Sequence, residues 1–170
     1  MFPVITYLDV GQADSILIEE NNEYMLIDAG NNESGPYLVN YFKSLGIEKF
    51  EYVIGTHAHE DHIGGIPFLI QHVFIPVIYA PRLAAALIKH KLDEMRIKEK
   101  VKIVEYTEND FIKIGNSFTA QFFQVTHSIP DSFGICVDTN EGRIVTTGDF
   151  KIDLTPVGPD INLGKMARLG

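Results

Sequence analysis

The sequence predicts a mixed α/β domain in which layered β-sheets are covered by helices on the outside. β-Rich runs occupy both ends of the chain, and helical patterns lie between them. Of the 170 residues, 45% are hydrophobic, which is enough to build a core. Because strands come first, then helices and then strands again, we expect separate sheets with helices on their outer faces.

The first third of the chain is typical of a β-meander followed by a helix. The turn-forming segments VGQAD and ENNE separate three short strands. These strands are predicted at residues 4–9, 15–19 and 24–28. A helix is predicted over 36–46, because Pro36 suits a first turn and Gly46 suits an end. Its expected apolar stripe consists of Leu38, Val39, Phe42 and Leu45.

The middle of the chain predicts a strand at 50–57, a short helix at 63–73 and a strand at 75–80. A long amphipathic helix is expected over 81–99. Its expected apolar side consists of Leu83, Leu87, Ile88 and Leu92. The rest is mainly β-structure, followed by a loop-like segment with a short final helix. The strands predicted here are 102–106, 110–115, 118–125, 133–139 and 143–149, the last two joined by the hairpin turn TNEGR.

Composition excludes some classes of protein and only weakly opposes others. No run of about 18 apolar residues is present, so a transmembrane helix is not expected. The N-terminus lacks signal-peptide features, and the single cysteine, Cys136, predicts a buried thiol, which is compatible with a cytoplasmic location. The formal net charge of −9 argues against nucleic-acid binding when taken alone. Carboxylates that hold cations are neutralised by them, however, so the charge decides little.

The segment GTHAHEDHIGG, residues 55–65, carries the strongest chemical signal. Imidazole nitrogens and carboxylate oxygens together form the ligand set of zinc and related divalent ions. On extended chain, the i, i+2 spacing points His57 and His59 the same way, so both rings can bind one ion. Asp61 and His62 follow, where a tight turn directs them at a second position. The alternative, a solvated loop with incidental histidines, explains this density poorly, whereas His72 and His90 are expected to have surface or packing roles.

Further ligands are predicted where later strands end. One strand runs into His127 in FFQVTHSIPDS, and another runs into Asp149 in RIVTTGDF. Asp28 closes YMLIDAG in the same way. An aspartate between two cations can bridge them and reduce their repulsion. Because strand ends meet at the rim of a sheet, we expect these groups to converge.

This pattern resembles the signature of the metallo-β-lactamase superfamily. Within it, THAHEDHIGGIPFLI, VTHSIPDSFGI and TGDFKIDLTPVGPDINLGKMARLG are similar to ribonuclease J of the β-CASP RNase family, from about residue 52 to 170. The first third, YLDVGQADSILIE with YMLIDAG, is more similar to ComEC-type competence metallo-β-lactamase domains. DVGQGDS is usual there, and Ala13 replaces the second glycine.

The resemblance implies a four-layer metallo-β-lactamase αββα sandwich. It implies that residues 1–170 are an incomplete, N-terminal part of the domain, without the β-CASP domain and the C-terminal remainder. The implied metal ligands are His57, His59 and His127 for one zinc, Asp61 and His62 for the other, and Asp149 as the bridge. The implied supporting residues are Asp28, which orients the ligand loop, and Ser128, Asp131 and Ser132, near the substrate phosphate or bracing the His127 loop.

The family takes a further histidine ligand from beyond the TGDF strand, and no histidine follows His127 here. The second site is therefore expected to lack one ligand, as in a fragment or a truncated product. Apolar surface exposed where absent parts should dock would favour homo-oligomers or aggregation.

We expect hydrolysis of a phosphodiester by water that two zinc ions activate, with manganese fitting the same donors. Asp61 and His62 are the expected catalytic residues, with Asp61 accepting the proton of the attacking water or holding it in line. RNA is the favoured substrate, in the cytoplasm and without a membrane partner. The alternatives are a ComEC-type DNA nuclease, a thioester or lactone hydrolase, and a metal-binding fragment without turnover.

Overall fold

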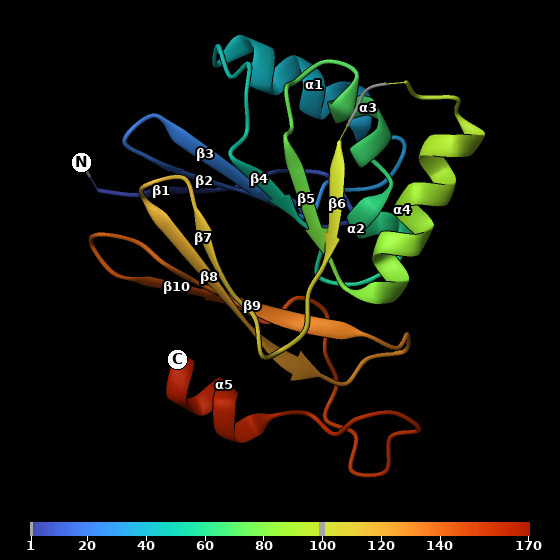
Figure 1. Ribbon diagram of the computed structural model, residues 1–170, viewed down its shortest axis with the longest axis vertical. Coiled ribbons are helices and arrows are strands. Elements are labelled where there is room, and N and C mark those ends of the chain that lie inside the picture. Colours follow the sequence, from blue (N-terminus) through green and yellow to red (C-terminus); the bar gives the residue numbers. More distant parts are fainter. Residues whose placement is uncertain (1, 99–100) are drawn as a thin grey trace.

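The computed structural model describes residues 2–98 and 101–170 (Figure 1). These residues form two β-sheets and five helices. The helices are α1 (Gly35–Ser44), α2 (Glu60–Ile63), α3 (Ile66–Ile70), α4 (Arg82–Glu94) and α5 (Leu163–Leu169). The six-stranded sheet has the order β1 (Val4–Tyr7), β2 (Ile16–Glu20), β3 (Glu23–Ile27), β4 (Tyr52–Ile54), β5 (Val77–Ala80) and β6 (Lys102–Glu105). The four-stranded sheet has the order β10 (Arg143–Thr146), β9 (Ser132–Asp138), β8 (Phe118–Val125) and β7 (Phe111–Ile114).

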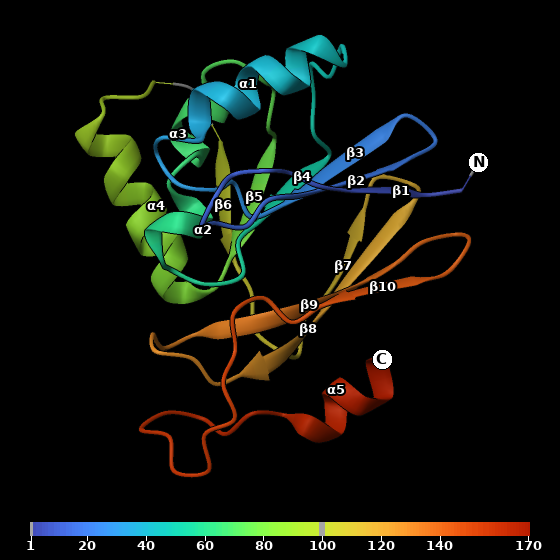
Figure 2. The same cartoon turned by 180° about the vertical axis from the view of Figure 1, so that it is seen from behind.

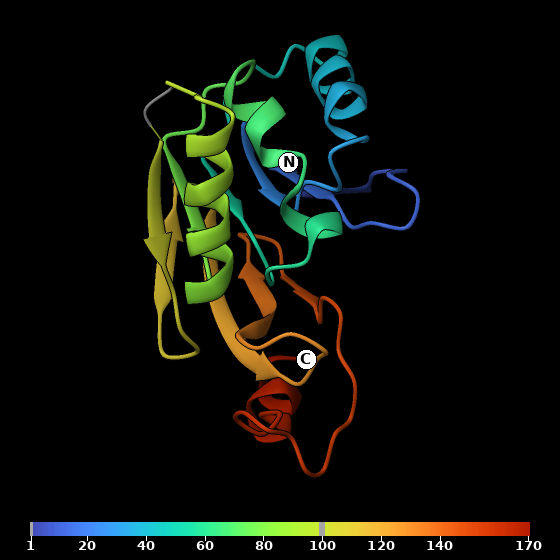
Figure 3. The same cartoon turned by 90° about the vertical axis from the view of Figure 1, so that its right-hand side faces the viewer.

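The two sheets lie face to face between helices, so the predicted αββα layering is confirmed. Helices α1 to α4 cover the six-stranded sheet, and α5 covers the four-stranded sheet (Figures 1 and 2). From the side, the cyan α1 and the red α5 lie at opposite ends of the molecule (Figure 3). The alternation of strand side chains produces this arrangement: in β2, Leu17 packs toward the helices, whereas Ile16 and Ile18 pack between the sheets. Cys136 is buried beneath α5, as predicted.

The strand directions bring several chain segments to one edge of the sandwich. Strands β3 and β4 run parallel, with Ile27 paired to Ile54, so both end together. Strands β8 and β10 are both antiparallel to β9 and therefore also end on a common side. The residues that follow these four ends include the predicted metal ligands.

Several local predictions differ from the structure. The helix expected at 63–73 is shorter, because only α3 (Ile66–Ile70) lies within this range, and Gly64–Gly65 separate it from α2, which ends at Ile63. A Cβ on Gly65 would lie 2.0 Å from the carbonyl oxygen of Ala29, so this glycine allows a close crossing of two chain segments. The buried apolar stripes of the helices predicted at 36–46 and 81–99 are narrower than expected, since Leu45 is 51% exposed and Leu87 is 38% exposed.

The long predicted helix is shorter than expected. Helix α4 ends at Glu94, and Arg96 adopts a positive φ of 52° that ends the helical conformation. Residue 99, the predicted end, lies outside the described residues. Within the described residues, no helix has the length and hydropathy needed to cross a membrane.

Candidate metal centre

The turn after β4 presents the first two histidines. His57 is fully buried, and His59 has extended backbone angles of −70° and 149° at the start of α2. The i, i+2 spacing brings the rings together, with Nε2 of His57 3.1 Å from Nδ1 of His59. Asp61 and His62 lie on α2, so a single helical turn, rather than the predicted tight turn, carries them.

A third histidine from the other sheet joins this pair. Nε2 of His127, in the loop after β8, lies 3.2 Å from Nδ1 of His59. One nitrogen from each of His57, His59 and His127 lies within 4.8 Å of the other two. Tetrahedral zinc with bonds of about 2.1 Å separates its nitrogen ligands by about 3.4 Å, so these three rings fit such a site.

A second group combines His57, His62 and Asp149, again with one ligand atom each within 4.8 Å. Oδ2 of Asp149 lies 3.7 Å from Nε2 of His62 and 3.6 Å from Nε2 of His127. Asp149 therefore lies between the two groups. Oδ2 of Asp61 lies 3.9 Å from Nε2 of His62, and its side chain is 42% exposed. Asp61 can therefore reach both the second position and solvent.

Asp28 holds the ligand turn from behind. Its Oδ2 lies 2.7 Å from Nδ1 of His62, which leaves Nε2 of that ring facing Asp149. The backbone N–H of Thr56 donates to Oδ1 of Asp28 at 2.8 Å, and the Thr56 hydroxyl donates to Oδ2 at 2.7 Å. Oγ1 of Thr56 also lies 3.0 Å from Nδ1 of His57, so it can accept a hydrogen bond from that ring. This arrangement leaves Nε2 of both rings available to a cation.

The electrostatics differ between the two groups. Burial, together with His62, His127 and His59, lowers the pKa of His57 to about 2, so this ring is neutral as a ligand must be. Burial also disfavours the charged form of His62, but the hydrogen bond to Asp28 and nearby carboxylates outweigh it and raise the pKa to about 9. In the metal-free protein, the second group therefore holds an imidazolium among carboxylates.

The residues predicted to support the His127 loop have different surroundings. Ser132 is buried, and its hydroxyl donates to the carbonyl oxygen of Ile129 at 3.0 Å, which braces the loop. Asp131 adopts a positive φ of 56° at the turn. Ser128 is exposed and, with Asp131, lines a cavity beside His127.

Three residues at this site were missed in the sequence. Thr56 was read only as part of the strand end. Asp14 forms a further group with Asp28 and His62, and burial followed by nearby carboxylates raises its pKa. Thr126 joins the ligand loops, because its hydroxyl donates to the carbonyl oxygen of Lys151, two residues after Asp149. For Asp14, the polar turn VGQAD was the available signal.

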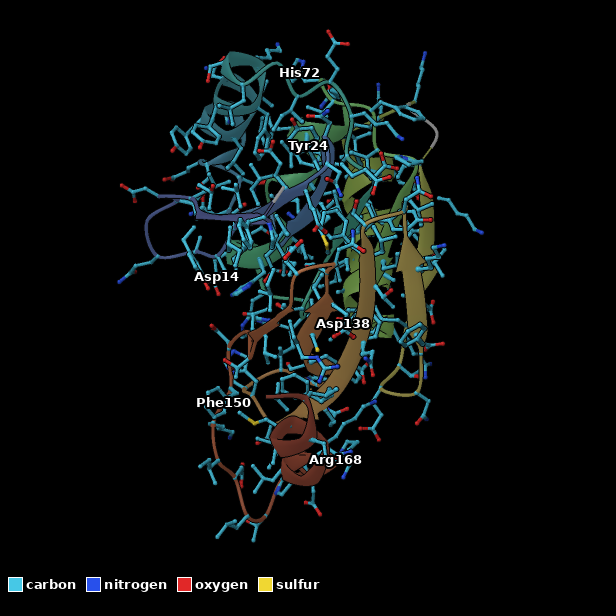
Figure 4. All side chains as sticks on the ribbon, turned by 90° about the vertical axis from the view of Figure 1, so that its left-hand side faces the viewer. Asp14, Tyr24, His72, Asp138, Phe150 and Arg168 are labelled. Carbon is cyan, nitrogen blue, oxygen red and sulfur yellow. The ribbon has the colours of Figure 1, made fainter. Side chains whose placement is uncertain are left out.

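The side chains labelled in Figure 4 show on which side of the molecule the candidate metal centre lies. Asp14 and Phe150, which follows Asp149, lie on the same side of the molecule (Figure 4). Asp138 and Arg168 lie away from that side in the same view. His72 and His90 are exposed and lie outside the groups described above. Their predicted surface position is confirmed.

Known proteins share this sequence pattern and this fold. A family model described as the metallo-beta-lactamase superfamily matches residues 8–160. Ribonuclease J of Mycoplasma pneumoniae is 40% identical over 167 residues, covering 89% of this chain and 28% of that protein. Ribonuclease J 1 of Streptococcus pyogenes is 40% identical over 161 residues, covering 90% of this chain and 28% of that protein. The chain thus spans little more than a quarter of the length of these relatives.

Solved structures agree in fold at low sequence identity. A metallo-β-lactamase of Cronobacter sakazakii with a HARLDQ motif has a TM-score of 0.67 at 19% identity, covering 98% of this chain and 64% of that one. A diphosphatase of the PhnP family has a TM-score of 0.59 at 20% identity, covering 73% of this chain and 48% of that one.

Proposed function

Because the chain belongs to the metallo-β-lactamase superfamily, we propose that it is the metal-binding part of a phosphodiester hydrolase of the ribonuclease J type. The single observation that carries this proposal is the convergence of His57, His59 and His127 from two different sheets. At these separations each pair of nitrogens needs a proton or a cation between them, and one cation can serve all three rings. The similarity to ribonuclease J proteins supports RNA as the substrate.

The donor set fits two divalent cations. His57, His59 and His127 would hold one ion, Asp61 and His62 would hold the other, and Asp149 would bridge them. Zinc suits this mixture of imidazoles and carboxylates, and manganese fits it as well. When bound, such a pair of cations makes water acidic and stabilises negative charge on the leaving oxygen.

The side chains then have separate tasks. Asp61 is exposed enough to meet substrate, and its Oδ2 can accept the proton of the attacking water. Asp28 keeps Nε2 of His62 directed toward the centre, and Thr56 does the same for His57. Ser132 holds the loop that carries His127.

The location and association state complete the proposal. A cytoplasmic location agrees with an RNA substrate. Apolar side chains are exposed on β1 and just before it, where Tyr7 is 73% and Phe2 is 77% exposed, and this surface supports self-association.

The test begins with the zinc content of the 170-residue chain, measured by inductively coupled plasma mass spectrometry. We expect about two ions per chain and hydrolysis of 5′-monophosphorylated RNA faster than single-stranded DNA or a thioester. His59→Ala should lower zinc content and hydrolysis together, while the exposed control His90→Ala should change neither. Full zinc content and full RNA hydrolysis in His59→Ala would contradict the assignment.

A further inference from the structure

A cavity of about 460 Å³ opens directly beside the candidate metal centre. One wall is the end of β8 with its following loop, residues 124–131, and includes His127. The other wall belongs to the segment that follows Asp149, residues 151–159. A ligand in this cavity would therefore touch both loops that supply candidate metal ligands.

The lining combines apolar surface with a few polar groups, which is typical of a ligand site. Its apolar members are Val125, Ile129, Pro130, Pro156, Val157 and Pro159. Three of them are prolines, whose fixed φ angles keep the walls rigid. We call this space the proline-lined cavity. Ser128 and Lys151 supply hydrogen-bond donors at its rim.

Main-chain pairing fixes the two walls to each other. The backbone N–H of Lys151 donates to the carbonyl oxygen of Thr126 at 2.7 Å, and the Thr126 hydroxyl donates back to Lys151. Thr126 precedes His127, and Lys151 follows Asp149 by two residues. The shape of the cavity is therefore tied to the positions of both candidate ligands.

Lys151 offers a phosphate one cationic partner at the cavity. Its Nζ lies 2.9 Å from Oδ2 of Asp153, and its side chain is 53% exposed. Asp131 and Asp153 also line the cavity, so Lys151 is placed among carboxylates. Asp153 also accepts a hydrogen bond from the backbone N–H of Thr155, and its ion pair with the exposed Lys151 is weak enough for an incoming phosphate to replace it.

We propose that the proline-lined cavity binds one nucleotide unit of a single-stranded substrate, next to the phosphate that is cleaved. The base lies against the prolines, and the phosphate of that unit binds Nζ of Lys151 in place of Asp153. This proposal rests on the proposed function and adds the place where the chain is held. The volume lies within the range of about 300–1,000 Å³ found for small-molecule sites.

Two neighbouring substitutions test the proposal because they should act in opposite directions. Binding is measured by fluorescence anisotropy with a labelled, hydrolysis-resistant phosphorothioate RNA pentamer and zinc-loaded protein. Lys151→Met should weaken binding about fivefold, which corresponds to one lost charged hydrogen bond. Asp153→Asn should strengthen it about threefold, because Lys151 no longer has a competing carboxylate. Lys113→Met, at an exposed position on β7, should leave it unchanged.

A purely structural role for the pair would weaken binding in both variants, and that result would overturn the proposal, as would no change in either. Equal zinc content in all variants shows that the centre itself is intact. A pentamer of abasic deoxyribose phosphates should bind weaker than the RNA, and equal binding would remove the base from the proposal.

The two proposals fail in different ways. If wild-type protein with two zinc ions hydrolyses no RNA, the proposed function is wrong, while the opposite shifts in binding still support the cavity. If RNA is hydrolysed and Lys151→Met leaves both KM and binding unchanged, the cavity proposal is wrong and the proposed function stands.

Discussion

Strand β3 carries a carboxylate at each of its two ends, and the two have opposite surroundings. At the start of the strand, Glu23 accepts hydrogen bonds from the backbone N–H groups of Asn116 and Ser117 in the facing sheet. Just past the end, Asp28 is bonded to the side chains of Thr56 and His62. Glu23 thus joins two turns, whereas Asp28 orients Thr56 and His62 toward the candidate metal centre.

The two ends of β3 differ in whether the folded chain alone satisfies their polar side chains. Both carboxylate oxygens of Glu23 receive backbone hydrogen bonds, so this side chain needs no added group, although the neighbouring Glu20 leaves its buried Oε1 without a partner among the described residues. At the other end, ring nitrogens of His57, His59 and His127 face one another. Each close pair of nitrogens needs a shared proton or a shared cation, and three rings that meet at one place suit a cation. We call the Glu23 end of β3 the hairpin end, and the end with Asp28 and the three histidines the metal end. The hairpin end contributes stability, and the metal end presents groups that can bind a cation.

Removing Asp28 should have the largest effect of any single substitution. Asp28→Ala leaves His62 buried without its partner and takes a hydrogen-bond acceptor from Thr56, so we expect a loss of about 3 kcal/mol in the free energy of unfolding. Zinc affinity should fall about 10–100-fold, as for other groups that orient ligands. Urea unfolding and competition with a chromogenic chelator measure both quantities. Asp9→Ala, at an exposed position, is the control, and unchanged zinc affinity in Asp28→Ala would contradict the orienting role.

Adding zinc should complete the metal end and leave the hairpin end unaffected. At a free zinc concentration of about 100 times Kd, each site adds about 2.7 kcal/mol to the free energy of unfolding. Thermal unfolding with zinc and with EDTA measures the gain. His59→Ala should lose most of it, and an equal gain in wild type and His59→Ala would show that zinc binds elsewhere.

Cutting the link between the His127 and Asp149 loops should have a smaller effect. Thr126→Val keeps the shape of the side chain but loses the hydrogen bond to Lys151, at a cost of about 1 kcal/mol. Thr126→Ser retains the hydroxyl and should restore both stability and zinc affinity. If Val and Ser behave alike in urea unfolding and zinc binding, the hydroxyl does not position the ligands.

The smallest effect should come from Glu23, and it should depend on pH. Burial opposes ionisation of Glu23, but the N–H groups of Asn116 and Ser117 outweigh it and hold the pKa below the ordinary value of 4.5. The stabilisation is therefore complete above about pH 4.5 and is lost as the pH falls through the folded pKa. Glu23→Gln should be less stable than wild type by about 0.5 kcal/mol at pH 7, because solvent screens this partly exposed carboxylate, and the gap should close in acid.

Urea unfolding at several pH values checks this prediction. Glu33→Gln, at an exposed position in the loop before α1, is the matched control. A gap that stays constant down to pH 3 would mean that the charge of Glu23 contributes nothing.

The meeting of the candidate ligands was largely predictable from sequence, because their positions follow simple local rules. His57 and His59 are two residues apart after a strand, and His127 and Asp149 each follow later strands. Convergence then depends only on strand ends sharing one edge. The four-layer fold followed from the resemblance, which includes the second sheet.

The features that the sequence did not predict depend on residues that are distant in the chain. Thr56 matters because Asp28 lies opposite it, a contact across 28 residues. The need for a glycine at residue 65 depends on Ala29, whose carbonyl oxygen leaves no room for a Cβ there. Leu45 and Leu87 fit helical spacing, but each helix has only one neighbouring layer, so the edge of its stripe stays exposed.

The crossing at Gly65 has a consequence for protein engineering. Ala29 donates its backbone N–H to the carbonyl oxygen of His62 at 2.7 Å, and Gly65 donates to Gly30 at 3.1 Å. Main-chain atoms therefore anchor the ligand turn in addition to the side-chain bond between Asp28 and His62. The partly exposed Asp61 can be exchanged for another donor while this support stays in place, which makes it the natural position for redesigning metal selectivity.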